Sequence, residues 1–285
     1  SGSLLMKCGR LIRQRTGARK YALYGQEAIG STWALAKMNM FLHGEDNHRI
    51  EWGDTIRNPK LLDGGASLKH FDIVVANPPF SLEKWGFEGA EADKFSRFRR
   101  GLPPRTKGDS AFILHMVETM KPGSGRMAVV VPHGVLFRGA AEGRIRQKLI
   151  EENLLDVVIG LPEKLFYGTG IPACILVLDK ENATARKGIF MIDASKGFRK
   201  DGPKNRLREQ DIHRIVDTFR RQDASDPRYA RMVPVAEIAD PKNAYNLNLP
   251  RYIDSTEPED LQDIDGHLRG GIPERDLDAL GGYWK

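Results

Sequence analysis

Short apolar runs alternate with longer amphipathic stretches along most of the chain. Runs rich in β-branched residues predict buried strands, and apolar residues three or four positions apart predict helices. Strands are expected at residues 21–27, 48–54, 71–76, 127–131, 154–161, 172–179 and 189–194. Helices are expected from residue 4 onward, after residues 27 and 108, and at 138–153 and 209–221. This alternation predicts an α/β sheet with helical crossovers.

Two of the expected helices carry a clear apolar face, which predicts packing against a sheet. The face of the earlier helix consists of Ile29, Trp33, Ala36 and Met40. The face of the later helix consists of Ile212, Ile215, Val216 and Phe219.

Polar residues follow three of the expected strands. Glu27, Asp54 and Asn77 each come at or just after a strand end, and open α/β sheets bind ligands at the carboxyl ends of their strands. A carboxylate about 20 residues beyond a glycine loop is the usual place for gripping ribose hydroxyls. Residues 1–5, Ser-Gly-Ser-Leu-Leu, are either the tail of such a loop or a cloning scar. Glu27 also fits a helix-start acid, and Asp54 an ordinary turn or N-cap.

The strand at 71–76 ends abruptly in Asn77-Pro78-Pro79-Phe80, because prolines donate no ladder hydrogen bonds. Asn77 precedes a proline and is therefore held extended. Its Oδ1 and the Pro78 carbonyl are two acceptors for an exocyclic amino group, and Phe80 offers a ring for stacking. The pattern favours a site that grips a planar amine, although a strand ending in a Pro-Pro turn has the same local sequence.

Composition narrows the class of protein. The 285 residues, 40% of them apolar, are enough for one sizeable core with an appended segment, and the net charge of +6 favours a polyanionic partner. Cys8 and Cys174 are too far apart in sequence for a disulfide framework, and the seven histidines show no metal-ligand spacing. We therefore expect a cytoplasmic protein without a metal. No apolar run approaches the roughly 18 residues of a membrane span, so no membrane is expected.

A segment at residues 81–107 mixes aromatic with basic side chains beside the Asn77 strand end. This composition favours a loop that contacts nucleic-acid phosphates, although a solvated mobile loop has the same composition. The expected DNA-backbone contacts are Arg97, Arg99, Arg100, Arg105 and Lys107.

Asn77-Pro78-Pro79-Phe80 resembles the catalytic motif of amino-group DNA methyltransferases, and the surrounding blocks resemble the modification subunit of type I restriction-modification systems. These blocks include residues 1–5, 165–171, 245–254 and 265–273. The resemblance implies a class I S-adenosylmethionine-dependent methyltransferase fold, Rossmann-like. It also implies methyl transfer to N6 of adenine in double-stranded DNA, together with a specificity subunit and a restriction subunit.

The resemblance also implies roles for single residues. Asn77, Pro78, Pro79 and Phe80 would form the catalytic motif, and Phe80 with either Phe166 or Tyr167 would stack on the flipped base. The cofactor S-adenosylmethionine would be held by Ser1, Gly2, Ser3, Glu27, Asp54 and Asn77. Cytosine-C5 chemistry is disfavoured, because Ala173 separates Pro172 from Cys174.

The chain departs from the family at its beginning, where the helical N-terminal domain and the first sheet strand are missing. That strand is central in the fold, so we expect a gap in the sheet and weak cofactor binding by this chain alone. The expected divisions are an incomplete catalytic domain at 1–180, an appended strand and helix region at 181–250, and a tail for subunit contacts at 251–285. Two alternatives are an RNA or protein-glutamine amide methyltransferase and a non-catalytic assembly fragment.

Overall fold

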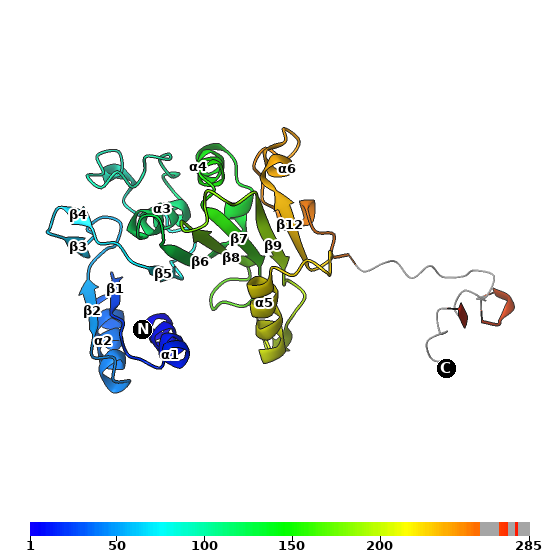
Figure 1. Cartoon of the computed structure of the whole chain (residues 1–285), viewed down its shortest axis with the longest axis horizontal. Coiled ribbons are helices and arrows are strands. Elements are labelled where there is room, and N and C mark those ends of the chain that lie inside the picture. The colour runs from blue at the N-terminus through cyan, green and yellow to red at the C-terminus, as the bar shows by residue number, and fades with distance from the viewer. Residues whose placement is uncertain (257–267, 273–276, 279–285) are drawn as a thin grey trace. The chain divides into compact units, whose positions relative to one another are not determined.

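Six strands form the main sheet, in the order β12-β9-β7-β8-β6-β5 (Figure 1). Pairing is parallel between β5 and β6 and between β7 and β9, whereas β8 runs antiparallel to both β6 and β7. It follows that β5, β6, β7 and β9 all end at one edge, here called the carboxyl edge. In chain order the strands are β5 (Ile73–Ala76), β6 (Arg126–Pro132), β7 (Leu155–Gly160), β8 (Ala173–Asp179), β9 (Gly188–Asp193) and β12 (Ala230–Pro234).

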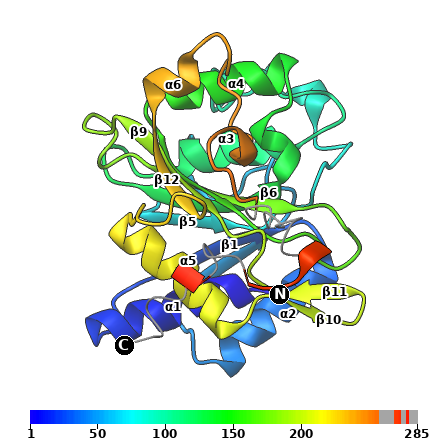
Figure 2. The ribbon, with the colours of Figure 1, turned by 90° about the vertical axis from the view of Figure 1, so that its right-hand side faces the viewer.

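Helices cover both faces of this sheet (Figures 1 and 2). One face carries α3 (Asp109–Thr119), α4 (Ala140–Glu151) and α6 (Val235–Ala239). The other face carries α5 (Glu209–Arg221), and α1 (Ser3–Thr16) contacts β5. Because both faces are covered, the strands are apolar on both sides, and all of β9 is buried.

A separate two-stranded parallel sheet pairs β1 (Leu23–Glu27) with β2 (His48–Trp52), and α2 (Gly30–Leu42) packs on it. Within the described residues no hydrogen-bonded ladder joins β1 to β5. Helix α1 contacts both strands and so links the two sheets. The gap expected from the sequence is present at this position.

The computed structural model describes residues 1–256, 268–272 and 277–278. Two compact units are present, Ser1–Asp254 and Ser255–Lys285. Of the predicted tail block at 265–273, residues 265–267 and 273 lie outside the described residues.

Several short elements escaped the sequence analysis. They are the hairpin of β3 (Leu62–Asp63) and β4 (Ser67–Leu68), the hairpin of β10 (Arg199–Asp201) and β11 (Lys204–Arg206), and edge strand β12. Three 3₁₀ turns also occur, at Phe87–Gly89, His133–Leu136 and Leu249–Arg251. Strands this short, or this polar, carry no hydrophobic period. In the predicted face of α2, Ile29 is 61% exposed because it lies at the N-cap, before the helix proper.

The expected division at residue 180 falls inside one sheet. Strands β9 and β12 come from the 181–250 region, yet they extend the sheet that begins with β5 to β8. Tyr252 and Ile253, from the expected tail, are buried in the main hydrophobic cluster. The first compact unit therefore continues through residue 254.

The aromatic and basic segment at 81–107 is packed rather than solvated. Trp85 is 1% exposed, and its Nε1 donates a hydrogen bond of 2.9 Å to the Pro104 carbonyl. Phe87 and Phe98 meet the Trp85 ring edge-on. This small core holds the segment against the beginning of α3, since Ala111 belongs to the same cluster.

Candidate active site

Asn77 lies directly after β5, at the carboxyl edge. Its side chain is exposed, and no hydrogen bond to its amide is found among the described residues. Pro78 is buried, and its packing fixes the position of the turn that follows Asn77. The amide of Asn77 is therefore exposed at the carboxyl edge, and its role as an acceptor stays a prediction.

Phe80 meets Phe166, which comes from the loop of residues 161–172 between β7 and β8, here called the base loop. The ring centroids are 5.6 Å apart and the interplanar angle is 71°. A planar base stacked on one ring would meet the other by its edge, a favoured aromatic geometry. Tyr167 is 90% exposed, and Lys204 Nζ lies over its ring. The structure thus brings Phe166, and not Tyr167, to Phe80.

Asp109, at the start of α3, holds the turn that follows Phe80. Ser81 has a left-handed backbone with φ of 50°, and its N–H donates to Asp109 Oδ1 at 2.7 Å. The Ser81 hydroxyl donates to Oδ2 at 3.3 Å, and Arg138 Nη1 donates to the same oxygen at 3.0 Å. Asp109 is 1% exposed, so these partners replace water around a buried carboxylate.

The charge network extends to a second buried carboxylate. Arg138 Nη1 also donates to Glu142 Oε1 at 3.0 Å. Burial raises the pKa of Glu142, and although burial alone would lower the pKa of Arg138, the two carboxylates raise it. Sequence reasoning treated Gly108-Asp109 only as a helix start, because Ser81 lies far away along the chain. The sequence alone carries no signal for this role, because the burial of Asp109 and its partners appear only in the folded chain.

The two carboxylates that the sequence predicted to contact a cofactor lie where the paired strands β1 and β2 end. Glu27 Oε1 accepts from the Ile29 N–H at 2.9 Å, and the Gly53 N–H donates to the Glu27 carbonyl at 2.9 Å. Asp54 Oδ1 accepts from the N–H groups of Ile56 and Arg57 at 2.8 and 2.9 Å. Asp54 therefore does cap a turn, the local reading that the sequence left open.

The groups at these two strand ends are chemically suited to binding a nucleoside. The second carboxylate oxygens of Glu27 and Asp54 can accept from hydroxyl and amino groups, and both strands end side by side. Gly2, with φ of 73°, precedes the first turn of α1, whose backbone N–H groups lack intrahelical partners. Ser1 and Ser3 lie at the same helix end, where the Asn39 amide donates to the Ser1 carbonyl at 2.8 Å.

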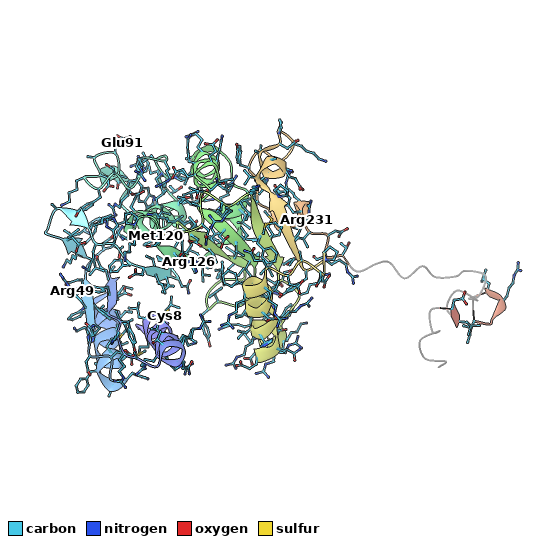
Figure 3. The ribbon with its side chains drawn as sticks, in the orientation of Figure 1. Cys8, Arg49, Glu91, Met120, Arg126 and Arg231 are labelled. Carbon is cyan, nitrogen blue, oxygen red and sulfur yellow. The ribbon has the colours of Figure 1, made fainter. Side chains whose placement is uncertain are left out.

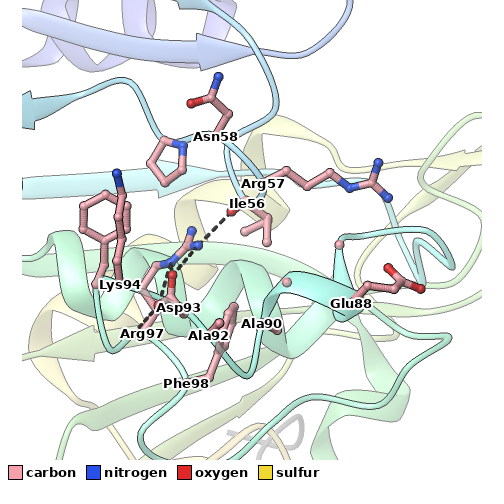
Figure 4. Close-up of a pocket in the computed structure, with 14 residues that line it drawn as sticks. Ile56, Arg57, Asn58, Glu88, Ala90, Ala92, Asp93, Lys94, Arg97 and Phe98 are labelled. Carbon is pink, nitrogen blue, oxygen red and sulfur yellow. Dashed lines mark hydrogen bonds and ion pairs between the residues drawn. The ribbon is translucent and has the colours of Figure 1, made fainter.

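The five predicted phosphate-binding residues fall into two groups. Arg97 is 4% exposed, pairs with Asp93 at 2.8 Å and donates to the Ile56 carbonyl at 2.7 Å (Figure 4). Arg100 is 6% exposed and pairs with Glu118 and Glu152. A phosphate would have to reach two buried guanidinium groups and displace the carboxylates paired with them, which is at odds with the expected contact. Arg99, Arg105 and Lys107 are not buried.

A cavity of about 540 Å³ lies between the turn at Ile56–Pro59 and residues 86–98 (Figure 4). Arg57 and Lys94 lie on its lining, and the Arg97–Asp93 pair forms part of its wall. It adjoins the turn capped by Asp54, whereas no residue of the Asn77 motif lines it.

His133 follows β6 at the carboxyl edge and was missed by sequence reasoning. Its Nε2 is buried and has no hydrogen-bond partner among the described residues. Burial lowers the pKa of His133, so the ring is neutral near pH 7. An unpartnered imidazole nitrogen beside the Asn77 strand is a candidate ligand contact, and only the tertiary structure distinguishes it from the other histidines.

Other chemistries receive no support from the described residues. Cys174 is fully buried, and burial raises the pKa of its thiol far above the usual value, so it is no nucleophile. No group of three or more His, Cys, Asp or Glu is arranged to hold a metal ion in the described ranges. No described helix is long and apolar enough to cross a membrane.

Comparison with known proteins finds one matching family model and several similar curated proteins. A family model described as N-6 DNA Methylase matches residues 1–261. The methylase subunit of the type I restriction enzyme MjaVII from Methanocaldococcus jannaschii is 34% identical over 277 residues, covering 93% of this chain and 46% of the relative. The MpnII methylase subunit from Mycoplasma pneumoniae is 34% identical, covering 93% and 49%. The chain thus spans about half the length of these curated relatives.

Solved structures give the same picture for the fold. The methyltransferase subunit of a type I restriction-modification system from Streptococcus thermophilus superposes with a TM-score of 0.77 at 38% identity, covering 89% of this chain and 52% of that one. A putative class I S-adenosylmethionine-dependent methyltransferase from Listeria monocytogenes shares the fold, with a TM-score of 0.55 at 17% identity. The fold is that of the class I methyltransferases.

Proposed function

Because this chain belongs to the N-6 DNA methylase family, we propose that it supplies the catalytic centre for methylating N6 of adenine in double-stranded DNA. The observation that carries the proposal is the pairing of an available Asn77 amide with the Phe80–Phe166 ring pair at the carboxyl edge. Relatives whose names identify type I methylase subunits support a role in a restriction-modification complex.

The chain's own residues act by orientation and electrostatics. The target base, flipped out of the duplex, stacks on one ring of the Phe80–Phe166 pair and meets the other by its edge. Asn77 Oδ1 and the Pro78 carbonyl accept from N6. These acceptors place partial negative charge where the amine becomes cationic, and they leave its lone pair free for in-line attack.

S-adenosylmethionine supplies an electrophilic methyl group when bound. Glu27 would accept from the ribose hydroxyls and Asp54 from the adenine amino group, with Ser1, Gly2 and Ser3 near the opening of α1. This proposal rests on the resemblance and on two half-buried carboxylates at adjacent strand ends.

Asp109 is proposed as a positioning residue. It binds both the N–H and the hydroxyl of Ser81, the residue directly after Phe80. Because Arg138 binds both Asp109 and Glu142, the turn after Phe80 is tied to α3 and α4 through a buried network.

The proposed assembly follows from the relatives. DNA phosphates would contact Arg99, Arg105 and Lys107 beside the site. A specificity subunit would read the DNA sequence, and it would contact the tail at 251–285, with a restriction subunit completing a cytoplasmic complex.

A methyl-transfer assay on the protein at its full length, with its specificity subunit, tests the proposal. Duplex DNA, RNA and release-factor protein are offered separately with labelled cofactor. We expect label only in DNA adenine, and Asn77→Ala should lower kcat by about 10²-fold or more, the usual effect of removing a preorganised polar group. The exposed Asn182→Ala variant is the matched control. Label in RNA or protein would assign the other methyltransferase class, and inertness would indicate an assembly role.

A further inference from the structure

After β9 ends at the carboxyl edge, the chain forms a small two-stranded hairpin beside the base loop. Strand β9 ends at Asp193, and β10 and β11 follow as a small antiparallel hairpin of residues 199–206, here called the basic hairpin. Gly202, with φ of 61°, and Pro203 form its two-residue turn, a tight connection that favours glycine first. Nothing in the proposed reaction uses this hairpin.

The basic hairpin has one anchored face and one outward face. Asn205 is 8% exposed, its N–H donates to the Lys164 carbonyl at 3.0 Å, and its Nδ2 donates to the Glu163 carbonyl at 2.9 Å. Side chains alternate between faces along a strand, and Arg199 pairs with Arg206 in the ladder. Arg199, Lys204 and Arg206 therefore share the face opposite Asn205.

These contacts tie the hairpin to the part of the molecule that carries Phe166. Glu163 and Lys164 lie in the base loop, a few residues before the ring that meets Phe80. Lys204 lies over the exposed ring of Tyr167, from the same loop. The hairpin cations are thus placed next to the proposed base site by buried hydrogen bonds.

The charge of the hairpin is strongly biased. Arg199, Lys200, Lys204 and Arg206 are opposed only by Asp201 within residues 199–206. Asp201 pairs with Arg206 at 3.5 Å, and both side chains are more than half exposed, so this surface pair is weak and readily exchanged. A concentration of cations on a rigid hairpin beside an aromatic residue is the chemistry that binds a nucleic-acid backbone.

We propose that the basic hairpin is a phosphate-binding arm that grips the DNA backbone next to the flipped base, an inference that rests on the proposed function. Arg199 and Arg206 contact phosphates from the outward face. Lys200 lies on the same side of the ladder as Asn205 but is exposed, and it contacts a further phosphate. Asn205 sets the distance between these contacts and Phe166. The arm is distinct from the residues at 99–107, which come from the segment after the Asn77 motif.

The test measures DNA affinity against salt concentration for the complete modification complex. The variant Arg199→Gln/Lys200→Gln/Arg206→Gln removes three exposed charges. The slope of log K against log [salt] is negative, and each lost phosphate contact reduces its magnitude by about 0.9. We therefore expect a slope shallower by about two to three, and affinity at low salt reduced by about 10- to 100-fold. The KM for DNA should rise, whereas kcat at saturating DNA and cofactor affinity should stay unchanged.

The matched control removes three cations near the opposite edge, where Arg126 begins β6 (Figure 3). Lys121, Lys148 and Lys187 are exposed and lie before β6, β7 and β9, and their change to Gln should leave the slope unchanged. The charge-conserving variant Arg199→Lys/Arg206→Lys should keep the wild-type slope. Equal slopes for the hairpin variant and the wild type, in a complex that methylates DNA, would refute the phosphate-binding role of the hairpin but not the proposed function. A complex that methylates no DNA would instead overturn the proposed function.

Discussion

At the scale of single residues, the proposed base site depends on which aromatic reaches Phe80. Phe166 does so, and Tyr167 faces solvent beside Lys204. Base stacking on an aromatic ring contributes about 1–3 kcal/mol, so Phe166→Ala should lower kcat/KM for DNA about 5- to 150-fold. Steady-state methylation kinetics measure the change, and Phe166→Tyr, which keeps the ring, should stay near wild type. A larger loss in Tyr167→Ala than in Phe166→Ala would contradict the assignment.

The buried Asp109 network predicts a loss of both activity and stability when the Asp109 charge is removed. Asp109→Asn keeps an acceptor for Ser81 but removes the charge that pairs with Arg138, so stability should fall by about 1–3 kcal/mol and kcat should drop. Ser81→Gly accepts the left-handed backbone and removes only the weaker hydroxyl contact, so it should remain active. Urea unfolding and kcat are measured in parallel, and an unchanged kcat in Asp109→Asn would exclude positioning.

His115 predicts how stability depends on pH. Burial, followed by the charge of Arg97, lowers the pKa of His115 to about 3, and Arg97 Nη1 donates to its Nδ1 at 3.2 Å. The unfolded chain takes up a proton below about pH 6.5 and the folded chain does not, so stability is retained above that pH and lost below it. Between pH 7 and 5 this histidine should cost up to about 2 kcal/mol.

The variant His115→Gln keeps an acceptor for Arg97 but cannot be protonated. Its free energy of unfolding, from urea titrations at several pH values, should therefore fall less steeply between pH 7 and 5 than that of the wild type. The exposed His43→Gln variant should retain the wild-type slope. Parallel slopes for His115→Gln and the wild type would contradict the assignment.

At the scale of elements, the separation of β1 from β5 predicts weak cofactor binding by this chain alone. Glu27 and Asp54 belong to the β1–β2 sheet, whereas Asn77 belongs to the six-stranded sheet. Without a ladder between the sheets, the groups expected to hold one cofactor are not rigidly placed, and ordering them on binding costs free energy. Isothermal calorimetry with S-adenosylmethionine should give a Kd weaker than about 100 μM. Micromolar binding would refute this expectation.

The elements differ in how far the sequence predicted them. Apolar β-branched runs located β5 to β9 within two residues, because strands buried on both faces have a continuous apolar signal. The expected and observed bounds of α5 coincide, with Ile215 buried, although Ile212 is 42% exposed. The basic hairpin was missed because its strands are short and polar, and because Asn205, which anchors it, contacts residues far away along the chain.

At the scale of the whole molecule, the first compact unit ends at Asp254, and this predicts where the chain tolerates removal. A chain ending at residue 254 should keep its melting temperature within about 2 °C, whereas one ending at residue 251 loses the buried Tyr252 and Ile253 and should melt several degrees lower. Scanning calorimetry measures both. By the proposed role of the tail, the first truncation should also weaken binding to the specificity subunit, and unchanged binding would remove that role.

The sequence by itself determined the α/β class, the positions of the main strands along the chain and the motif Asn77-Pro78-Pro79-Phe80. These depend on local composition, on hydrophobic periods and on proline stereochemistry, all of which are readable without contacts. Only the tertiary structure decided that Phe166 meets Phe80, that Asp109 holds Ser81, and that Arg97 and Arg100 are engaged by carboxylates. Each of these joins residues distant in the chain, and long-range packing, rather than any local pattern, brings such partners together.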